Sequence, residues 1–453
     1  MSLTTLPANT PPTVRLAALT LIGSMAFLTA CSDGVESGVG PGDGDGSGEI
    51  TNLQSAKARV SPGIAAADLQ PLVHGNTEFA FDMYRALRAE SDGNLFFSPY
   101  SISLALAMTW AGARGETETQ MEETLRLGLP SQNLHPAFNA LDQELANRGL
   151  NLPADEEGTG FQLSIVNSIW GQRDFAFEES FLDLLAQQYG AGMRLVDFIA
   201  APDRSRQLIN DWVEQQTQDR IQDLLPEGSV NVLTRLVLTN AIFFKASWLE
   251  AFDPAQTVSG TFFLADGSSR TASMMNQAVR TVYATGKDYQ AVELPYVGHE
   301  VSMVIILPAA DRFEAVEEAL DASTLNAIVG NLRDTWVTLT MPRFEFDADF
   351  GLSDVLKEMG MPIAFEPPSG DSGADFSGMD GSRVLFIHNV LHKAFVAVDE
   401  EGTEAAAATG VVIGVKSAPP SATMVVDRPF VFLIRDRATE TVLFLGRVSD
   451  PAE

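Results

Sequence analysis

The sequence contains little cysteine and few basic residues. Its 453 residues include one cysteine, Cys31, so no disulfide bond can form within the chain. The 29 lysines and arginines are outnumbered by 60 aspartates and glutamates, which gives a formal net charge of −31 at pH 7. Because the binding of nucleic-acid phosphates requires clustered lysine and arginine, this balance argues against a nucleic-acid partner. The apolar content of 45% is ample for a large core.

Motifs for metal ions, cofactors and catalysis are missing or incomplete. There is no His-Glu-x-x-His zinc motif and no phosphate-binding glycine loop, so neither a metal nor a cofactor is expected. Gly370-Asp371-Ser372-Gly373 copies the residues around the nucleophile of trypsin-like proteases, but it lies in a Pro-, Gly- and Ser-rich stretch that predicts a surface loop. Such a nucleophile needs a histidine base oriented by a carboxylate. No histidine has the sequence context of that base, so we expect no enzyme and disfavour a protease acting through Ser372; the five are His74, His135, His299, His388 and His392.

The N-terminus carries a short apolar run from Leu16 to Ala30, preceded by Arg15. Its fifteen residues are too few for a comfortable membrane span and fit the core of a signal peptide. The run ends in Leu28-Thr29-Ala30-Cys31, which resembles the lipobox of bacterial lipoproteins, where the cysteine is lipidated and becomes the new N-terminus. We therefore expect residues 1–30 to be a lipoprotein signal peptide. The mature protein would be exported and held by lipid on Cys31 at the bacterial cell envelope, on the outer membrane or the cell surface. An ordinary signal peptide with an incidental thiol is the weaker alternative.

Residues 31–60 are expected to be a flexible, acidic, glycine-rich tether. Within it, Asp43, Asp45 and Ser47-Gly48 imitate the start of a calcium-binding loop. The twelfth position of that loop is Gln54 rather than a bidentate glutamate, so we interpret the stretch as a linker.

Both helices and strands are predicted beyond the tether, which indicates the α+β class. Apolar residues at helical spacing predict a helix from Leu72 to Arg88. Ser98 followed by Pro99 is good capping chemistry and predicts a second helix that ends near Gly112. Strands are predicted at 161–172, 237–245, 337–346 and 386–398.

The most informative stretch spans residues 400–417. Four alanines behind Thr403 and Glu404, closed by Gly410, predict a short capped helix. With a period of two, the same run predicts a strand, because one of its faces holds only small or β-branched residues. That face comprises Thr403, Ala405, Ala407, Thr409, Val411, Ile413 and Val415. A segment that supports both structures is a candidate conformational switch.

In its context, this stretch resembles the hinge and reactive loop of the serpins, which are suicide inhibitors of proteases. His392-Lys393-Ala394-Phe395 precedes it and Arg428-Pro429-Phe430 follows it, and the resemblance covers the chain from about Leu72 to Pro451. It implies one domain over residues 61–453 with the serpin fold: three β-sheets, about eight or nine helices and an exposed reactive-centre loop. The implied hinge comprises Glu401, Gly402, Thr403, Glu404, Ala405, Ala406, Ala407, Ala408 and Thr409.

The resemblance also implies roles for residues of the domain. Ser98, Ser101 and His392 would form the shutter, near the point where the main sheet opens. Asn210 and Trp212 would lie at the breach, where loop insertion starts. Capping by Ser98, and plain core roles for Trp212 and His392, stay open as alternatives.

Serpin spacing, counted from Gly402, implies a scissile bond at Lys416–Ser417. A neighbouring bond is an alternative, since the run to Arg428-Pro429 is slightly longer than is common in the family. Lysine on the acyl side favours a trypsin-like target. The implied function is covalent inhibition of that serine protease by a monomer whose cleaved loop inserts into the central sheet. A non-inhibitory carrier or chaperone, cleaved as a plain substrate, is the alternative.

Overall fold

The computed structural model describes residues 49–64, 69–150, 152, 161–403 and 421–452. The expected signal peptide, Cys31, Glu404 to Thr409 and the bond Lys416–Ser417 lie outside these described residues. No helix among them is long and apolar enough to span a bilayer.

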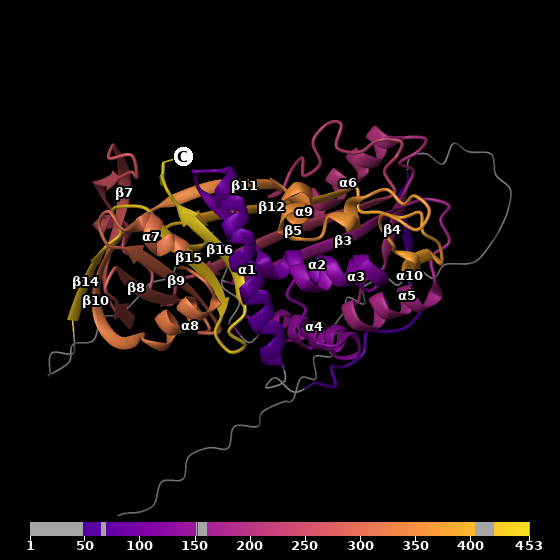
Figure 1. The fold of residues 1–453 in the computed structure, drawn as a ribbon. Coiled ribbons are helices and arrows are strands. Elements are labelled where there is room, and N and C mark those ends of the chain that lie inside the picture. Colours follow the sequence, from indigo (N-terminus) through magenta and orange to yellow (C-terminus); the bar gives the residue numbers. More distant parts are fainter. Residues whose placement is uncertain (1–48, 65–68, 151, 153–160, 404–420, 453) are drawn as a thin grey trace, which may run out of the picture. The chain divides into compact units, whose positions relative to one another are not determined.

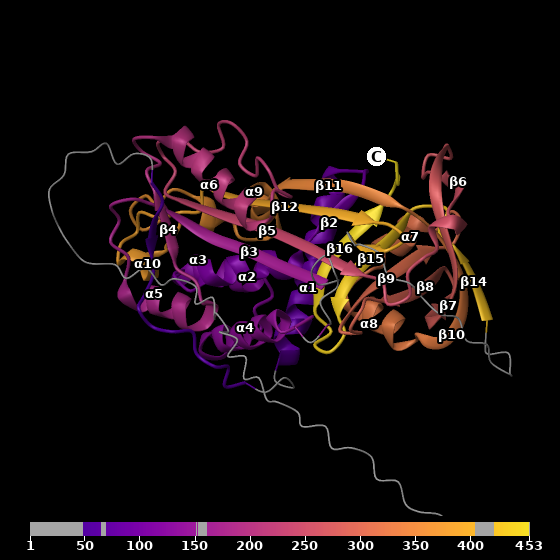
Figure 2. The ribbon, with the colours of Figure 1, turned by 180° about the vertical axis from the view of Figure 1, so that it is seen from behind.

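A seven-stranded sheet forms the centre of the described domain (Figure 1). Figure 2 shows its long strands side by side from behind. Its interior strands are apolar along their whole length because both faces are covered: β5 has eleven buried residues of twelve. From one edge to the other the strands are β1 (Thr51–Leu53), β4 (Met193–Val196), β3 (Phe161–Gln172), β5 (Leu236–Ser247), β13 (Gly402–Thr403), β12 (Asn389–Val398) and β11 (Phe344–Gly351).

The second sheet contains nine strands, and its long central member explains a difference from the expected sheet count. β7 spans 17 residues and pairs with β6 through Ser269 to Met274, with β8 through its last residues, and with β10 along most of its length. Because β7 pairs with β6, β8 and β10, all of these strands belong to one sheet. The described residues therefore form two sheets rather than the three expected. The strands are β14 (Ser421–Val425), β10 (Arg333–Pro342), β7 (Ser269–Thr285), β8 (Tyr289–Pro295), β9 (Val301–Pro308), β15 (Phe430–Asp436), β16 (Val442–Val448) and β2 (Leu95–Phe97), with β6 (Val258–Phe263) on β7.

Ten α-helices surround the sheets in the described ranges, against the eight or nine expected. The predicted first helix is present as α1, and Ser98 caps α2 by accepting a hydrogen bond from the Ser101 amide at 3.2 Å. α2 packs against β3 and β5 on one face of the central sheet, and α6 packs on the other face. The helices are α1 (Gln70–Glu90), α2 (Pro99–Trp110), α3 (Gly115–Thr124), α4 (Ser131–Ala146), α5 (Glu179–Leu184), α6 (Pro202–Gln216), α7 (Phe313–Glu318), α8 (Ala322–Gly330), α9 (Leu352–Met359) and α10 (Ser377–Asp380).

The predicted strand 337–346 is wrong as a single element. The chain forms two strands there, β10 and β11, which belong to different sheets. The break falls at Pro342-Arg343, because proline has no amide hydrogen for a ladder and the Arg343 amide instead donates to the Ser273 carbonyl at 2.8 Å. The chain thereby crosses from the second sheet to the central sheet at Arg343.

The expected tether is wrong in its last part, because residues 49–60 pack on the domain as an N-terminal arm. β1 pairs antiparallel with β4, from Thr51 opposite Leu195 to Leu53 opposite Met193. Farther on, the Arg59 guanidinium lies 2.7 Å from an Asp142 oxygen on α4. The backbone pairing holds the arm against one edge of the central sheet, and the ion pair holds it against α4. The Gly-rich composition upstream did not indicate these contacts. At the opposite edge, β11 points Glu345, Asp347 and Asp349 outward.

Candidate functional site

The two middle strands of the central sheet are separated at one end by the hinge. β13 lies between β5 and β12: Thr403 is opposite Ala246 of β5 and Val398 of β12. Past the hinge, β5 and β12 pair directly and in parallel, from Val237 opposite Asn389 to Ile242 opposite Ala394. We call these six directly paired positions the seam. The sheet is thus already parted at the hinge end and closed along the seam.

Both hinge residues fit their gap closely. A Cβ atom on Gly402 would lie 2.1 Å from the Ala246 carbonyl oxygen, so only glycine allows this approach of the two backbones. The Thr403 side chain is 2% exposed, and its hydroxyl is 2.7 Å from the Tyr296 hydroxyl. The inward position of the hinge therefore accepts a small side chain that forms one hydrogen bond.

The turn before the hinge is fixed by an aromatic pair. Trp248 and Tyr296 stack with ring centroids 4.6 Å apart, and the Trp248 indole N–H donates to the Asp399 carbonyl at 3.0 Å. The Trp248 amide donates to the Glu401 carbonyl at 2.8 Å. The Asp399 carboxylate accepts the Glu401 amide at 2.9 Å and the Gly402 amide at 3.2 Å. These bonds set where the chain enters the gap between β5 and β12.

A buried carboxylate, that of Glu400, lies at the same end of the sheet. Glu400 is 1% exposed, forms an ion pair with Arg343 and accepts a hydrogen bond from Thr257. Burial by itself raises the pKa of Glu400, but the hydrogen bonds from Arg343 and Thr257 outweigh it and hold the pKa below its usual value. Glu400 therefore ties the hinge turn to the point where the chain crosses between the sheets.

The two members of this pair differ in exposure, which predicts unequal effects of their removal. Arg343→Gln leaves a buried carboxylate without its cation and should lower the free energy of unfolding by roughly 2–4 kcal/mol. Glu400→Gln leaves an arginine that is 48% exposed and can turn into water, so about 1 kcal/mol is expected. Denaturant unfolding of both variants measures the difference, and equal losses would contradict the account.

A row of polar side chains crosses the middle of the sheet. Asn167 of β3 is opposite Asn240 of β5, which is opposite His392 of β12. Asn240 donates through its amide to the Ser101 hydroxyl and to the Asn167 amide oxygen. Asn167 in turn donates to the Ser101 carbonyl at 3.1 Å. The row links three strands of the sheet to the start of α2, and it crosses the seam between Asn240 and His392.

The hydrogen bonds fix the tautomer of His392. The Ser98 amide donates to its Nε2 at 3.1 Å, so Nε2 carries no proton and Nδ1 donates to the Asn240 side-chain oxygen. The ring is 0% exposed, and burial lowers the pKa of His392 to about 3. Ser98, Ser101 and His392, which the resemblance assigns to the shutter, therefore lie in one hydrogen-bonded cluster, in which His392 is neutral. Their role as a shutter stays a prediction.

This buried imidazole predicts an acid-sensitive native state. Between pH 6.5 and about 3 the unfolded chain binds a proton at His392 that the folded chain does not, so the stability falls as the pH is lowered. His135, whose pKa burial lowers to about 4, adds to the effect. Each histidine should remove about 2 kcal/mol between pH 7 and pH 5. Denaturant midpoints across this range measure the slope, which His392→Gln should reduce and the exposed-site control His74→Gln should not; an unchanged slope in His392→Gln would contradict the account.

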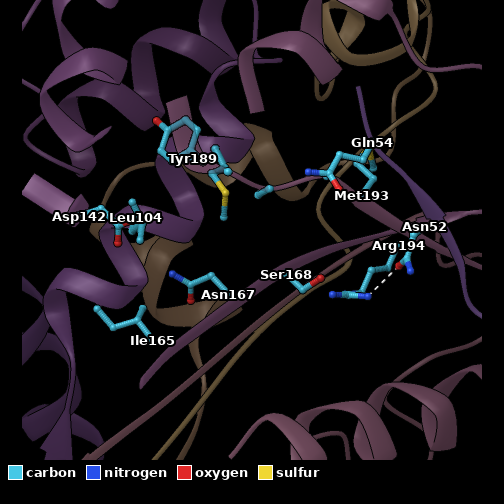
Figure 3. Close-up of a pocket in the computed structure, with 14 residues that line it drawn as sticks. Asn52, Gln54, Leu104, Asp142, Ile165, Asn167, Ser168, Tyr189, Met193 and Arg194 are labelled. Carbon is cyan, nitrogen blue, oxygen red and sulfur yellow. Dashed lines mark hydrogen bonds between the residues drawn. The ribbon is translucent and has the colours of Figure 1, made fainter. Parts of the chain in front are cut away.

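A cavity of about 340 Å³ lies beside this row on the side of the N-terminal arm (Figure 3). Its walls include Asn167 of β3, Met108 of α2 and Asn52 of the arm, and Asn52 accepts a hydrogen bond from Arg194 at 2.7 Å. Asn167, at one end of the polar row, thus borders a cavity on this side.

The predicted place of Asn210 and Trp212 is wrong. Both lie on α6. The Asn210 side chain forms two hydrogen bonds with the backbone of Leu225. Trp212 packs edge-on against Trp170, with ring centroids 5.4 Å apart. Trp170 is opposite Val237, ten residues along β5 from the hinge partner Ser247, or about 33 Å at 3.3 Å per residue. The two residues therefore pack α6 onto the sheet at the end remote from the hinge.

Sequence reasoning missed the residues that hold the hinge end and the middle of the row. Asn167 and Asn240 carry a signal that could have been used, because an amide within an apolar strand is costly unless it is bonded. The others carry no such signal, since their partners are distant in sequence; they are Trp248, Tyr296, Arg343 and Glu400. The described part of the chain contains no cluster of three or more histidine, cysteine or acidic residues placed to bind a metal.

The comparisons with known proteins agree with this geometry. The family model described as Serpin (serine protease inhibitor) matches residues 74–451. An uncharacterized serpin-like protein of Thermococcus kodakarensis is 38% identical over 387 residues, which cover 85% of this chain and 87% of that protein. The leukocyte elastase inhibitor of Sus scrofa is 37% identical over 84% of this chain and all of that protein.

A solved structure supports the fold. The crystal structure of the thermophilic serpin tengpin in the native state matches with a TM-score of 0.77 and 28% identity, covering 89% of this chain and all of that one. The matching family is one of protease inhibitors rather than catalysts. The fold, the hinge between β5 and β12 and these matches lead to one conclusion: the chain belongs to the serpin family.

Proposed function

We propose that the protein is a covalent inhibitor of trypsin-like serine proteases, cleaved at Lys416–Ser417. The observation that carries this proposal is the hinge: Thr403 already lies between β5 and β12, with the seam directly beyond it. A loop that begins inside the sheet can continue into it without a separate initiation step. The relatives named as protease inhibitors support the class of function.

In the proposed reaction, the protease serine attacks the carbonyl carbon of Lys416. The peptide bond to Ser417 breaks, the new amine of Ser417 leaves with the proton from the protease histidine, and an ester joins Lys416 to the protease. The freed strand then enters the seam, where β5 and β12 exchange their direct ladder for two ladders to the new strand. Residues 402–416 as a strand span about 45–50 Å at 3.3 Å per residue, which carries the protease along the sheet.

The inward residues of the loop favour fast insertion, and insertion must outrun hydrolysis of the ester. Thr403, Ala405, Ala407 and Thr409 are all small and uncharged. A carrier or chaperone that is cleaved as a plain substrate would tolerate proline or charge at these positions. Their absence here favours the inhibitor over that alternative.

The proposed specificity and location follow from the sequence. Lysine at 416 suits a protease whose specificity pocket carries a carboxylate. Lipid on Cys31 would hold a monomeric inhibitor at the bacterial cell envelope, with residues 32–48 between the lipid and the arm. The partners of the protein are then the target protease and the membrane.

The decisive experiment mixes the soluble chain from residue 49 onward with excess trypsin. We expect a complex that survives a denaturing gel, together with a released peptide whose mass begins at Ser417. Clean cleavage after Lys416 without a complex would replace the proposed function with the substrate alternative. A released peptide with another N-terminus would relocate the scissile bond.

A further inference from the structure

The end of the seam remote from the hinge is joined by side chains as well as by the backbone ladder. Asn389 donates through its side-chain amide to the Ser229 carbonyl, and the Asn231 amide nitrogen lies 3.3 Å from Nε2 of His388. We call these four residues the clasp. Ser229 and Asn231 precede β5, whereas His388 and Asn389 stand at the start of β12, so the clasp crosses the seam. In Figure 1 this end of the central sheet is the one that carries β4 and α10, away from β14.

The half of the clasp that precedes β5 is a turn fixed by its own hydrogen bonds. The Asn231 amide donates to the Thr234 hydroxyl at 2.9 Å, and the Thr234 amide donates back to the Asn231 carbonyl at 2.9 Å. The Asn231 side-chain oxygen accepts the Leu233 amide at 2.9 Å. The side-chain nitrogen of Asn231 can only donate, so Nε2 of His388 is its acceptor. The turn therefore presents its bonding groups to β12 in fixed positions.

A strand that fills the gap between β5 and β12 must separate the two halves of the clasp. At the hinge end, Thr403 lies between Ala246 of β5 and Val398 of β12. Val237 and Asn389, which are opposite each other, each lie nine residues farther along these two strands. At 3.3 Å per residue the distance is about 30 Å on both sides. A strand that runs the whole length of the gap therefore ends at the clasp.

The clasp differs from the backbone ladder in what happens to its bonds when a strand enters. Each ladder bond between β5 and β12 is replaced by a bond to the backbone of the new strand, so those groups stay paired. The bond from Asn389 to Ser229 joins one side chain to one carbonyl across the seam, and no regular ladder restores it. Half-buried polar groups that lose a partner carry a cost in free energy. The clasp therefore stabilises the closed sheet selectively.

We propose that the clasp holds the remote end of the seam closed and sets the rate at which a strand completes its entry into the central sheet. The first part concerns the native protein alone; the second rests on the proposed function, in which the loop is the strand that enters. Asn389 and His388 are then positioning residues, which act through the separation of β5 from β12. The polar row joins the middle of the seam through Asn240 and His392, and the clasp joins its end three residues farther along β12.

Native-state amide hydrogen exchange of the uncleaved protein tests the first part. Asn389→Ala removes the donor to Ser229, and Asn276→Ala on β7 is the matched control, because Asn276 also donates through its side chain to a backbone carbonyl, that of Met274 at 3.0 Å. In Asn389→Ala the seam amides should exchange about tenfold faster, the equivalent of about 1.4 kcal/mol, while the amides of β9 and β15 keep their rates. The control should leave the seam unchanged. Equal acceleration in both sheets, or none at the seam, would overturn the proposal.

Asn231→Asp is a second variant, which keeps the turn and serves if Asn389→Ala does not fold. Its carboxylate can still accept the Leu233 amide, but it has no N–H group for His388. Burial lowers the pKa of His388, so at about pH 8 the ring is neutral and cannot replace the lost bond by an ion pair. The seam amides should exchange about threefold faster than in the unchanged protein. An unchanged seam in this variant would remove Asn231 and His388 from the clasp.

The lifetime of the active inhibitor tests the second part. The uncleaved proteins are incubated below their unfolding midpoints, and the remaining inhibition of trypsin is measured while circular dichroism confirms that they stay folded. Without the clasp the uncleaved loop should enter the sheet more readily, so Asn389→Ala should lose inhibition about tenfold faster than the unchanged protein and Asn276→Ala should not. Equal lifetimes would overturn the role of the clasp in insertion. Absence of inhibition by fresh, unchanged protein would instead overturn the proposed function, and the hydrogen-exchange result would still decide the first part.

Discussion

Thr403→Arg is expected to convert the protein from an inhibitor into a substrate. The Thr403 side chain is 2% exposed between β5 and β12, so arginine at this position places an unpaired charge inside the sheet. In the variant, the charged hinge is therefore expected to leave the gap between β5 and β12 in the native state. Insertion after cleavage would then have to bury this arginine. Each 1.4 kcal/mol added to the barrier of insertion slows it about tenfold, while hydrolysis of the ester is unaffected.

The measurement is the number of inhibitor molecules consumed for each trypsin molecule inactivated. We expect this ratio to rise by roughly tenfold or more in Thr403→Arg, with cleavage after Lys416 still efficient. Thr261→Arg on β6 is the matched control, since Thr261 is an exposed strand threonine and its replacement should leave the ratio unchanged. An arginine variant that inactivates trypsin with an unchanged ratio would refute insertion at this hinge.

Lys416→Leu should abolish the inhibition of trypsin and leave the fold intact. A trypsin-like specificity pocket binds the lysine ammonium through a buried carboxylate, and leucine leaves that carboxylate without a partner. We expect the association rate constant with trypsin to fall by about a thousandfold or more, the equivalent of about 4 kcal/mol. Inhibition should move to proteases that prefer large apolar residues.

Two controls make this second prediction specific. Lys287→Leu removes an exposed lysine from another place and should not change the rate. The insertion step can be checked in the same Lys416→Leu variant with a chymotrypsin-like protease, which should form a stable complex. Unchanged inhibition of trypsin by Lys416→Leu would show that another bond is the scissile one.

Local signals in the sequence predicted the parts of the site that depend on neighbouring residues. Ser98 followed by Pro99 predicted a capped helix, and the cap is the hydrogen bond from the Ser101 amide to the Ser98 hydroxyl. The small, period-two face of the hinge indicated a strand that could be buried, and Thr403, the one residue of that face that the structure describes, is buried in the sheet. These features required only spacing and side-chain size.

The features that sequence reasoning missed depend on partners far away in the chain. Arg343 meets Glu400 only because the chain crosses between sheets at Pro342-Arg343, which periodicity alone read as one continuous strand. The resemblance placed Asn210 and Trp212 at the wrong end of the sheet, because neither the matching motif nor a helical pattern specifies where along a strand the helix packs. The sequence did not predict the N-terminal arm, because its strand has three residues and is too short to show an alternation of apolar and polar side chains.

The two outer strands of the central sheet have a consequence for how copies of the protein behave together. If the central sheet takes up the loop as proposed, its outer strands must still not pair with the loop of a neighbouring molecule, although unpaired backbone groups at a sheet edge favour such pairing. One margin ends in β1, which offers only three residues, and the other carries the outward carboxylates of Glu345, Asp347 and Asp349 on β11. The short length of β1 and the repulsion between the carboxylates of β11 on neighbouring molecules both disfavour edge-to-edge association of the sheets. A sheet that opens at its centre, as the proposed mechanism requires, can thus avoid edge-to-edge association with neighbouring molecules.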